Sequence, residues 1–212
     1  MKAVTFSISH LTLLGLLLTV AAANEPIPEK DGIIAIEMES TASPLDLWEE
    51  KTEINDFSGE SYLEFTGNKP THGPPLSPLV YRFKAGRGGL YHFYLRCARE
   101  TIEERSDLAN DAYIRLEGDF GAGPTPGDKH GMDAPLAMLK NDTKFFGGKD
   151  RIFVWASGNR IDPGGHDNKR VAIYELKAGQ VYTFTISGRS QFFKADCFEF
   201  RQQDATARAD IR

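Results

Sequence analysis

Residues 171–200 constrain the fold of this chain most, because they read as three short strands in succession. The strands are expected at 171–176, 181–187 and 195–200. In the second strand, Tyr182, Phe184 and Ile186 fall on one face and smaller or polar residues fall on the other, which is the period of a half-buried strand. The turn before it contains Gly179, which adopts the positive φ that such turns often need.

The third of these strands places an acid among aromatic residues. Strict alternation puts Asp196 on the same face as Phe198 and Phe200. An unpaired buried charge is costly, so the acid needs a partner. The sequence therefore predicts a charged or hydrogen-bonding group from elsewhere in the chain beside Asp196.

Strand patterns recur along the rest of the chain, between loops that are rich in Gly and Pro. Helical turns are expected only at 99–110 and 134–140, and no segment has the pattern of a long amphipathic helix. Many short strands with turn signals between them favour an all-β sandwich or barrel, and we expect a two-sheet antiparallel β-sandwich (a jelly roll) with long connecting loops. Two strands joined by a Gly-rich turn, 79–83 and 90–98, are expected to pair as a hairpin. The other expected strands are 32–39, 61–65, 111–118 and 152–156.

The N-terminus has the pattern of a secretory signal peptide. Lys2 precedes an apolar run at 11–20, and small residues at 21–23 offer a cleavage site. The run is too short for a stable membrane span, although a retained membrane anchor is the alternative. We expect cleavage after Ala23 and export, to a secreted, periplasmic or cell-surface location. The expected organisation is a signal peptide at 1–23, one domain at 24–201 and a flexible tail at 202–212.

Charge and cysteine content exclude several classes of partner. Cleavage would remove one basic residue and leave 24 basic residues against 30 acidic ones. An acidic domain without a basic run is a poor candidate for binding nucleic acid or an anionic membrane surface. Cys97 and Cys197 lie in expected strands, where buried free thiols are common, so we expect them unpaired; a disulfide is the alternative in an exported protein. No CxxC or His/Cys cluster indicates zinc.

Four stretches together resemble carbohydrate-binding modules of families 6 and 35. They are GIIAIEME at 32–39, LVYRFKAGRGGLYHFYLRCA at 79–98, LKAGQVYTFTI at 176–186 and FFKADCFEF at 192–200. The resemblance implies a galactose-binding-like jelly roll, a structural calcium ion, and a sugar site in loops at one end or on a concave face. Such modules usually accompany secreted enzymes that degrade polysaccharides, so a separate enzyme of that kind is an expected partner.

The resemblance also implies a ligand set for the calcium ion. In these families acids of the opening strand and the Asp of the closing strand hold calcium, and Glu37, Glu39 and Asp196 match those positions. Calcium takes several hard oxygen ligands. Glu37 and Glu39 are two residues apart on a strand, about 7 Å, which suits one shared cation. The alternative is that both are ordinary solvent-facing strand acids.

Aromatic residues are the candidate sugar platforms, since a flat ring covers the apolar face of a pyranose. Trp155 stands where the resembling families often carry a stacking aromatic, and Tyr62 or Phe65 lies near their other one. Core packing is the alternative for each of them. Trp48 is expected to be a structural plug of the first long loop.

Polar residues beside the platforms complete the expected ligand site. Asn159 and Arg160 follow Trp155 and are expected to donate hydrogen bonds to hydroxyl or carboxylate groups; a solvated loop is the alternative. Family 6 modules often have an Asn two residues before the closing Asp; this chain has Lys194, which would favour a glycan carrying carboxylate or sulfate. Further loop residues have ligand-like types but no recognised metal spacing, and are expected to be loop residues first: Asp128, His130, Asp133, His166 and Asp167.

These features predict a secreted, non-catalytic protein that binds a polysaccharide or oligosaccharide. The competing classes are a jelly-roll lyase or hydrolase, and a structural or protein-binding sandwich on the cell surface. The stretch LKAGQVYTF is similar to part of one alginate lyase family, but the Gln-Ile-His segment and Arg-rich strand of that family are missing. No Gly-x-Ser-x-Gly turn occurs either, so no catalytic residue is expected.

Overall fold

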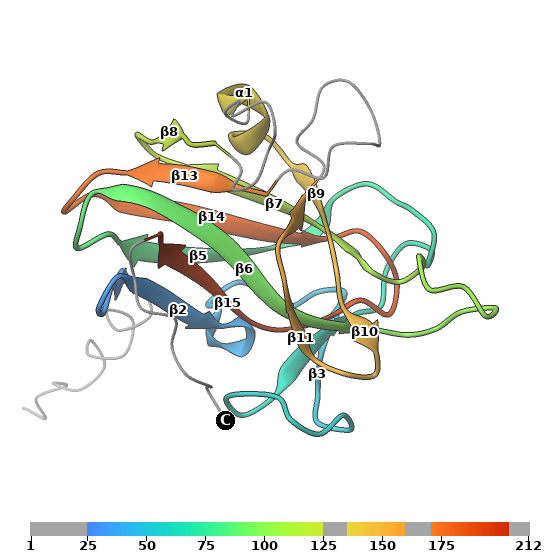
Figure 1. The fold of residues 1–212 in the computed structure, drawn as a ribbon. Coiled ribbons are helices and arrows are strands. Elements are labelled where there is room, and N and C mark those ends of the chain that lie inside the picture. Colours follow the sequence, from blue (N-terminus) through green and yellow to red (C-terminus); the bar gives the residue numbers. More distant parts are fainter. Residues whose placement is uncertain (1–24, 125–134, 160–170, 204–212) are drawn as a thin grey trace, which may run out of the picture.

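A computed structural model describes residues 25–124, 135–159 and 171–203 of the chain. In these ranges two sheets pack face to face around one core, as Figure 1 shows, which confirms the all-β sandwich. The expected signal peptide, Arg160, the five loop residues with ligand-like side chains, and positions 204–212 of the expected tail lie outside the described residues. In the described part of the chain, no helix is long and apolar enough to cross a membrane.

The first sheet has six strands, and its neighbours are antiparallel except for the pair β1 and β5. In spatial order they are β1 (Ile27–Pro28), β5 (Leu76–Lys84), β14 (Val181–Gly188), β7 (Asp111–Glu117), β9 (Thr143–Phe146) and β12 (Gly158–Asn159).

The second sheet has nine strands and is centred on β15 and β6. Its main path is β3 (Trp48–Lys51), β4 (Tyr62–Phe65), β15 (Lys194–Gln202), β6 (Gly89–Arg99), β13 (Ile173–Leu176) and β8 (Gly121–Ala122). Off this path, β2 (Ile33–Glu37) pairs with β15, while β10 (Lys149–Asp150) and β11 (Val154–Ala156) pair with β6.

Helical structure is limited to two short turns in the described ranges. They are η2 (Met38–Ser40) and α1 (Leu136–Leu139). The second confirms the helical turn expected at 134–140. The one expected at 99–110 is wrong, because this segment forms an irregular turn closed by a bridge between Ile102 and Arg105.

From β4 to β10, and again from β11 to β15, consecutive strands alternate between the two sheets, and this corrects the expected hairpin. β5 pairs with β14 in the first sheet, whereas β6 pairs with β15 in the second. Both β5 and β6 bury alternate large residues, and the chain between them crosses so that they face one core from opposite sides. The connection from β5 to β6 is hydrogen-bonded to the connection from β13 to β14. Gly179 has the expected positive φ, 77°, and donates its N–H to the carbonyl of Ala85 at 2.7 Å.

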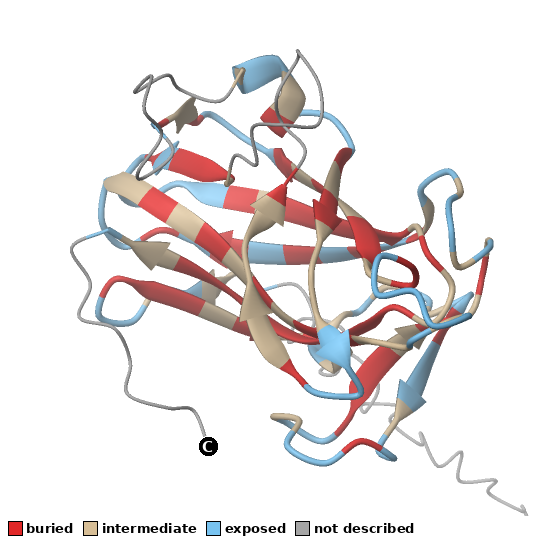
Figure 2. Ribbon diagram, turned by 45° about the vertical axis from the view of Figure 1, so that its right-hand side comes forward, coloured by how far each residue is buried: buried red, intermediate tan, exposed pale blue. Residues whose placement is uncertain are grey.

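The core consists of the alternating residues that the sequence marks as apolar. Tyr182, Phe184, Ile186, Phe198 and Phe200 are each at most 1% exposed, as predicted. Figure 2 shows the same alternation as buried and less buried bands along the long strands. Each fully buried side chain of this size contributes roughly 2–3 kcal/mol, so these rings are a main source of stability.

A β-bulge in β15 changes the position expected for Asp196. Ala195 lies opposite Cys97, but Cys197 already lies opposite Arg96, so one extra residue stands between the two pairs. The bulge lets Ala195 and Phe198 both face the core, although they are three residues apart. Asp196 is consequently not on the face of Phe198, and its carboxylate meets Arg96 and the loop 53–60 instead.

Two smaller expectations are also confirmed. Trp48 is 2% exposed and its indole Nε1 donates to the carbonyl of Ser77 at 2.9 Å, as suits a structural plug. Cys97 and Cys197 are both buried and unpaired.

Candidate functional site

Three carboxylates that are far apart in the sequence meet beneath the loop 53–60. Glu37 ends β2, Glu39 lies in η2, and Asp196 is the bulge residue of β15; we call these three the acid cluster. Loop groups donate to each of them. Ser58 donates its N–H to Asp196 at 2.9 Å and its hydroxyl to Glu37 at 2.6 Å, and the N–H of Glu60 donates to Glu39 at 2.9 Å.

Arg96 is the partner that the sequence requires for Asp196. It lies on β6, one strand away, and its Nη1 donates to Asp196 Oδ2. Its Nη2 donates to Asp56 of the loop at 2.9 Å. One guanidinium therefore faces the carboxylates of the acid cluster and that of Asp56, so negative charge is in excess here.

The excess negative charge and burial act on the pKa of two of these carboxyl groups. Burial raises the pKa of Glu37, and the neighbouring charges of Glu39 and Asp196 raise it further. Burial also raises the pKa of Asp196, against the hydrogen bond from Arg96. One oxygen, Glu39 Oε2, is buried without a hydrogen-bond partner. An additional cation would lower the free energy of all three acids.

The donor chemistry of the acid cluster fits calcium. Hard carboxylate oxygens, one of them unpartnered, are the ligands that calcium prefers. Gly59 makes room for the cluster, since a Cβ there would lie 2.0 Å from Glu39 Oε1. As they stand, no three or more acidic, histidine or cysteine side chains in the described ranges are arranged to hold a metal ion. The three carboxylates therefore do not form a complete site as they stand, and most of a calcium shell would come from other oxygens.

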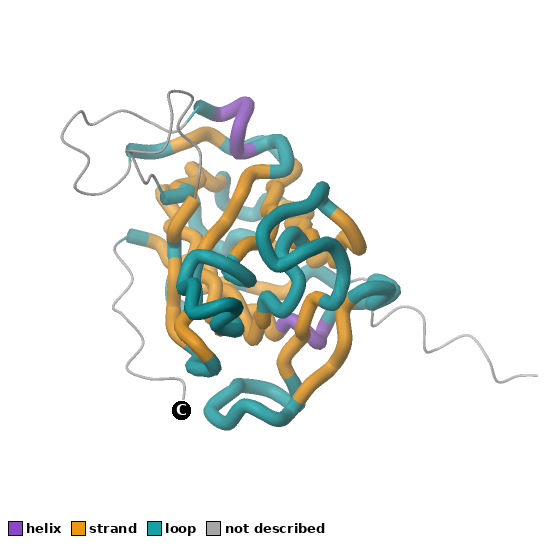
Figure 3. The backbone as a smooth tube through the Cα atoms, turned by 90° about the vertical axis from the view of Figure 1, so that its right-hand side faces the viewer, coloured by secondary structure: helices purple, strands orange, loops and turns teal. Residues whose placement is uncertain are grey.

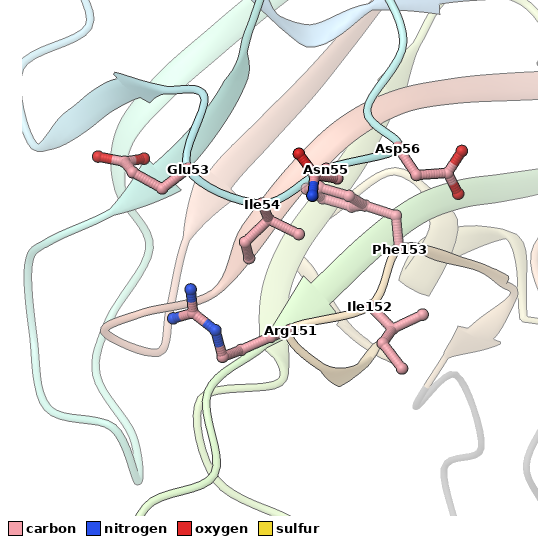
Figure 4. A pocket seen from close by; sticks show the side chains of 7 residues that line it. All are labelled: Glu53, Ile54, Asn55, Asp56, Arg151, Ile152 and Phe153. Atoms are coloured by element: carbon pink, nitrogen blue, oxygen red, sulfur yellow. The ribbon is translucent and has the colours of Figure 1, made fainter.

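Two adjoining hollows lie near the acid cluster. Figure 3 shows that loops gather at one end of the sandwich. The cleft in Figure 4, about 350 Å³, has the loop as one wall and the segment 151–153 as the other. The second hollow, which we call the charged pocket, measures about 480 Å³ and shares Glu53 and Arg151 with the cleft. It is lined by Lys51, Glu53, Tyr62, Glu64, Glu100, Ile102, Arg151, Phe192 and Lys194.

Strained backbone surrounds both hollows. Asp56, Arg151 and Phe192 have φ of 68°, 48° and 70°, in the left-handed region that residues with a Cβ rarely adopt. Such residues cost of order 1–3 kcal/mol each. Seven other residues with a Cβ have positive φ elsewhere in the described chain, so this conformation alone does not mark a ligand site. The strain at Phe192 accompanies a half-buried ring that lines the charged pocket.

Tyr62 and Lys194 share the charged pocket, but neither has the role expected of it. Tyr62 is 1% exposed and its ring packs against Phe153 at 5.1 Å between centroids, so it offers no face to a ligand. Burial and then the charge of Glu53 raise the pKa of Tyr62 to about 12, and its hydroxyl donates to Glu53 at 3.3 Å.

Lys194 is 2% exposed, and its ammonium is fully used inside the protein. It contacts Glu64 at 3.0 Å, Glu100 at 2.8 Å and the carbonyl of Phe192 at 3.1 Å. A lysine has three N–H donors, and all three are occupied. The expected contact between Lys194 and an acidic glycan is therefore corrected: this charge is neutralised by the pocket itself.

The other predicted platform residues lie elsewhere. Trp155, on the outer face of the second sheet, is covered by the guanidinium of Arg201, 4.6 Å from its ring centroid and 4.4 Å from that of Tyr94. Phe65 is a core residue. Asn159 is fully buried, and its amide has no hydrogen-bond partner. The prediction of one surface containing Trp155, Tyr62, Lys194 and Asn159 is therefore wrong.

Seven of the nine residues that line the charged pocket were not predicted from the sequence. Glu100, Arg151 and Phe192 are among the seven. Burial opposes ionisation of Glu100, but hydrogen bonds and charges from Lys194 and Arg151 lower its pKa below the ordinary value. The Arg151 side chain is 54% exposed and donates to Glu100 at 3.1 Å. The only signal for them in the sequence was the pair of phenylalanines before the closing strand, Phe192 and Phe193. Phe193 is buried, and Phe192 lines the pocket.

Comparison with known proteins adds similarities of fold. No family model matches the chain, and no curated protein matches it. Solved structures similar to it include a family 35 carbohydrate-binding module from Clostridium thermocellum, with 12% identity over 80% of this chain and 98% of that chain and a TM-score of 0.46. Another is the Podospora anserina GH26-CBM35 β-(1,4)-mannanase, with 14% identity over 86% of this chain and a TM-score of 0.47; this chain spans 30% of its length. The Cry4Aa toxin of Bacillus thuringiensis is also similar, with 8% identity over 85% of this chain and 25% of the toxin chain and a TM-score of 0.49.

Proposed function

We propose that this protein binds a polysaccharide or oligosaccharide in the charged pocket, without catalysing its cleavage, and that a structural calcium ion binds at the acid cluster. The residues that line the charged pocket are the observation that supports this proposal. A half-buried ring, Phe192, stands beside carboxylates and a guanidinium that form hydrogen bonds in fixed directions. Aromatic contact area with a few oriented polar groups is the general composition of a sugar site.

Arg151 is the group through which we propose a preference for acidic or sulfated glycans. Its side chain is the exposed member of the pair with Glu100, whereas Lys194 is buried. Nη1 of Arg151 donates to Glu100 at 3.1 Å, and the other face of the planar guanidinium is available to a carboxylate or sulfate. The acidic domain opposes such a ligand at long range, so the preference should weaken with salt.

The sequence resemblance to secreted modules supports export, to a secreted, periplasmic or cell-surface location, and a separate polysaccharide-degrading enzyme as a partner. Export and this partner enzyme are both included in the proposed function. A lyase or hydrolase is the alternative class, and new reducing ends or falling viscosity of a polymer would indicate it.

Binding isotherms on a panel of neutral, uronic and sulfated polysaccharides test the pocket. Phe192→Ala should weaken binding of the best glycan at least ten-fold, because it removes the contact face. Phe146→Ala is the matched control, a half-buried phenylalanine on the other sheet. Equal binding by wild type and a folded Phe192→Ala protein would place the platform elsewhere.

The acidic preference has its own test. Arg151→Gln should lower affinity for acidic glycans more than for neutral ones. Arg105→Gln is the control, since Arg105 is 53% exposed and also ion-paired, to Asp107. An unchanged ranking of the panel after Arg151→Gln would remove the support for an anionic ligand.

A further inference from the structure

Lys194 lines the charged pocket but lies almost entirely beneath its surface. It is on β15, where its register partners are Glu64 on β4 and Ala98 on β6, two residues before Glu100. Side chains directly opposite each other on neighbouring antiparallel strands have Cβ atoms about 4.5–5.5 Å apart. The sheet therefore brings Glu64 to the lysine, and the end of β6 brings Glu100. The lysine Nζ lies 3.0 Å from Glu64 and 2.8 Å from Glu100.

Exposure increases from this lysine outwards. The side chain of Lys194 is 3% exposed, that of Glu100 is 29% exposed, and that of Arg151 is 54% exposed. Each oxygen of Glu100 has its own cation, since Oε2 accepts from Lys194 at 2.8 Å and Oε1 accepts from Arg151 at 3.1 Å. A ligand in the pocket can therefore reach Arg151, whereas Lys194 acts on it only through the carboxylates in front of the lysine.

The charges that line the pocket balance only because Lys194 is among them. Three of the described lining residues are cationic and three are anionic: Lys51, Arg151 and Lys194, with Glu53, Glu64 and Glu100. Without Lys194, two cations would stand against three carboxylates, and the pocket would repel a carboxylate or sulfate. A partly buried site screens charge less than water does, so a single charge has a large effect on this balance.

The third hydrogen bond of Lys194 reaches the proposed aromatic platform. Nζ donates to the carbonyl of Phe192 at 3.1 Å, and Phe192 has a φ of 70°. This bond holds the residue whose ring we expect to contact any glycan, charged or neutral. Loss of Lys194 should therefore have two separable effects. One acts on the affinity for every glycan, and the other acts on the ratio between anionic and neutral glycans.

We propose that Lys194 is a positioning residue that gives the charged pocket its preference for anionic glycans without touching the glycan. It neutralises Glu64 and Glu100 from inside the protein, so that they do not cancel the exposed charge of Arg151. The inference rests on the proposed function, because it concerns the same pocket, and it adds the residue that determines the charge of the ligand.

Two pairs of probes with matched backbones measure this preference. They are a sulfated carrageenan hexasaccharide with its desulfated form, and hexagalacturonic acid with its carboxyl-reduced form. The measured quantity is the charge selectivity, which is the affinity for the anionic member of a pair divided by the affinity for the neutral member. Titration calorimetry on the whole protein gives both affinities.

Glu100→Gln removes a carboxylate but keeps an oxygen that accepts from Arg151. The charge selectivity should therefore rise about five-fold. Asp142→Asn is the matched control, because the side chain of Asp142 is also 29% exposed and also pairs with an arginine, Arg115, on the first sheet. It should leave the selectivity unchanged. A Glu100→Gln protein with unchanged or lower selectivity overturns the proposed charge balance.

Lys194→Met should lower the charge selectivity about five-fold, beyond any weakening that both members of a pair share. Lys194→Met/Glu100→Gln should return it to within about two-fold of the wild type, because cations and carboxylates balance again. A purely structural lysine predicts no such recovery. Wild-type selectivity in a folded Lys194→Met protein overturns the proposal. If that variant does not fold, equal selectivity in Glu100→Gln and in the double variant overturns it instead.

The titration of Glu100 separates this inference from the proposed function, because it needs no glycan. Burial raises the pKa of Glu100, but the hydrogen bonds and charges of Lys194 and Arg151 lower it below its usual 4.5. In Lys194→Met this pKa, followed by carboxyl 13C NMR, should rise, since a neighbouring cation favours the ionised form. Lys144→Met, which removes a cation from Asp111 on the first sheet, should leave it unchanged.

The outcomes distinguish the two claims. An unchanged pKa of Glu100 in Lys194→Met overturns the role of Lys194, whatever the glycans do. If the pKa rises but neither probe pair binds to the wild type, the proposed function fails, and the preference for anionic glycans fails with it. If the probes bind and Lys194→Met leaves their selectivity unchanged, the proposed function stands and only the role of Lys194 is wrong.

Discussion

Two buried aspartates lie in this sandwich, one in each sheet, and each is held by an arginine that also approaches an aromatic ring. In the first sheet Asp111 pairs with Arg189, whose guanidinium carbon lies 5.8 Å from the Tyr113 ring centroid. In the second sheet Asp196 pairs with Arg96, which approaches Phe153. The aspartates are 2% and 0% exposed, so their burial is nearly equal.

The difference lies in the charges around each pair. Asp111 has a second cation, Lys144, at 2.9 Å and accepts from the Ser190 hydroxyl at 3.4 Å. Asp196 has two further carboxylates beside it and no second cation among its described partners. A buried carboxylate is stable when the cations and hydrogen bonds around it offset the cost of its desolvation. The negative charge of Asp111 is therefore fully neutralised by its neighbours, whereas the negative charge around Asp196 is not.

Neutralising each aspartate should give the largest contrast. Asp111→Asn leaves two cations without their common anion and should cost about 3–5 kcal/mol of unfolding free energy. Asp196→Asn, measured in chelator, should cost only about 1 kcal/mol, because the loss of attraction to Arg96 is offset by weaker repulsion from Glu37 and Glu39. Urea unfolding of both variants decides it. Equal losses would mean that the two sites are of the same kind.

Calcium should stabilise one site and not the other. At a free concentration of 100 times its Kd, calcium should raise the unfolding free energy of the wild type by about 2.7 kcal/mol. The Asp111→Asn protein should keep this response, whereas Glu39→Gln and Asp196→Asn should lose most of it. Thermal melts with calcium and with chelator measure the effect. A Glu39→Gln protein that responds like the wild type would exclude Glu39 as a ligand.

His92, which lies on the same sheet as Asp196, should make the unfolding free energy depend on pH. Burial, and then the charge of Arg201, lower its pKa from 6.5 to about 4. The unfolded chain therefore binds more protons than the folded protein between these values, so stability is complete above pH 6.5 and is lost as the pH falls towards 4. Between pH 8 and pH 5 the loss should be about 2 kcal/mol. His92→Gln should remove this slope in urea unfolding at the two pH values; an unaltered slope would assign it to other groups.

Substitution of two glycines should give the smallest of these differences in unfolding free energy. Gly59 and Gly179 have similar φ, 67° and 77°, so alanine should cost about 1 kcal/mol at either for backbone strain. A Cβ at Gly179 meets nothing within 4 Å, but at Gly59 it meets Glu39 of the acid cluster. Gly59→Ala should therefore cost about 1 kcal/mol more and reduce the calcium response. Identical melting curves for the two variants would show that the cluster adapts freely.

Local patterns in the sequence were sufficient for most strands and for the core. Alternation is a property of neighbouring residues, so Tyr182, Phe184 and Ile186 could be placed inward without knowing their partners. β3 was missed because three of its four residues are charged, and only Trp48 is apolar. It lies at the edge of its sheet, where such composition is common.

Strand partners and the site depended on non-local information. A connection of four or five residues serves a hairpin or a crossing between sheets equally well, so the pairing of β5 with β14 was not predictable from the turn. The bulge at Asp196 is a single residue that changes which face it occupies. Lys194 looked free to bind a ligand because Glu64 and Glu100, which neutralise it, are far from it in sequence, although β4 and β6 are the neighbours of β15.

The central place of β15 in the second sheet has a consequence for how the chain folds. This last strand pairs with β2, β4 and β6, so it joins the two ends of the domain. Contacts so far apart in the sequence give a high contact order, and sandwiches of this kind fold in milliseconds to seconds. During synthesis the second sheet stays incomplete until the final strand has left the ribosome, and the edges of β2, β4 and β6 remain open to mispairing until then.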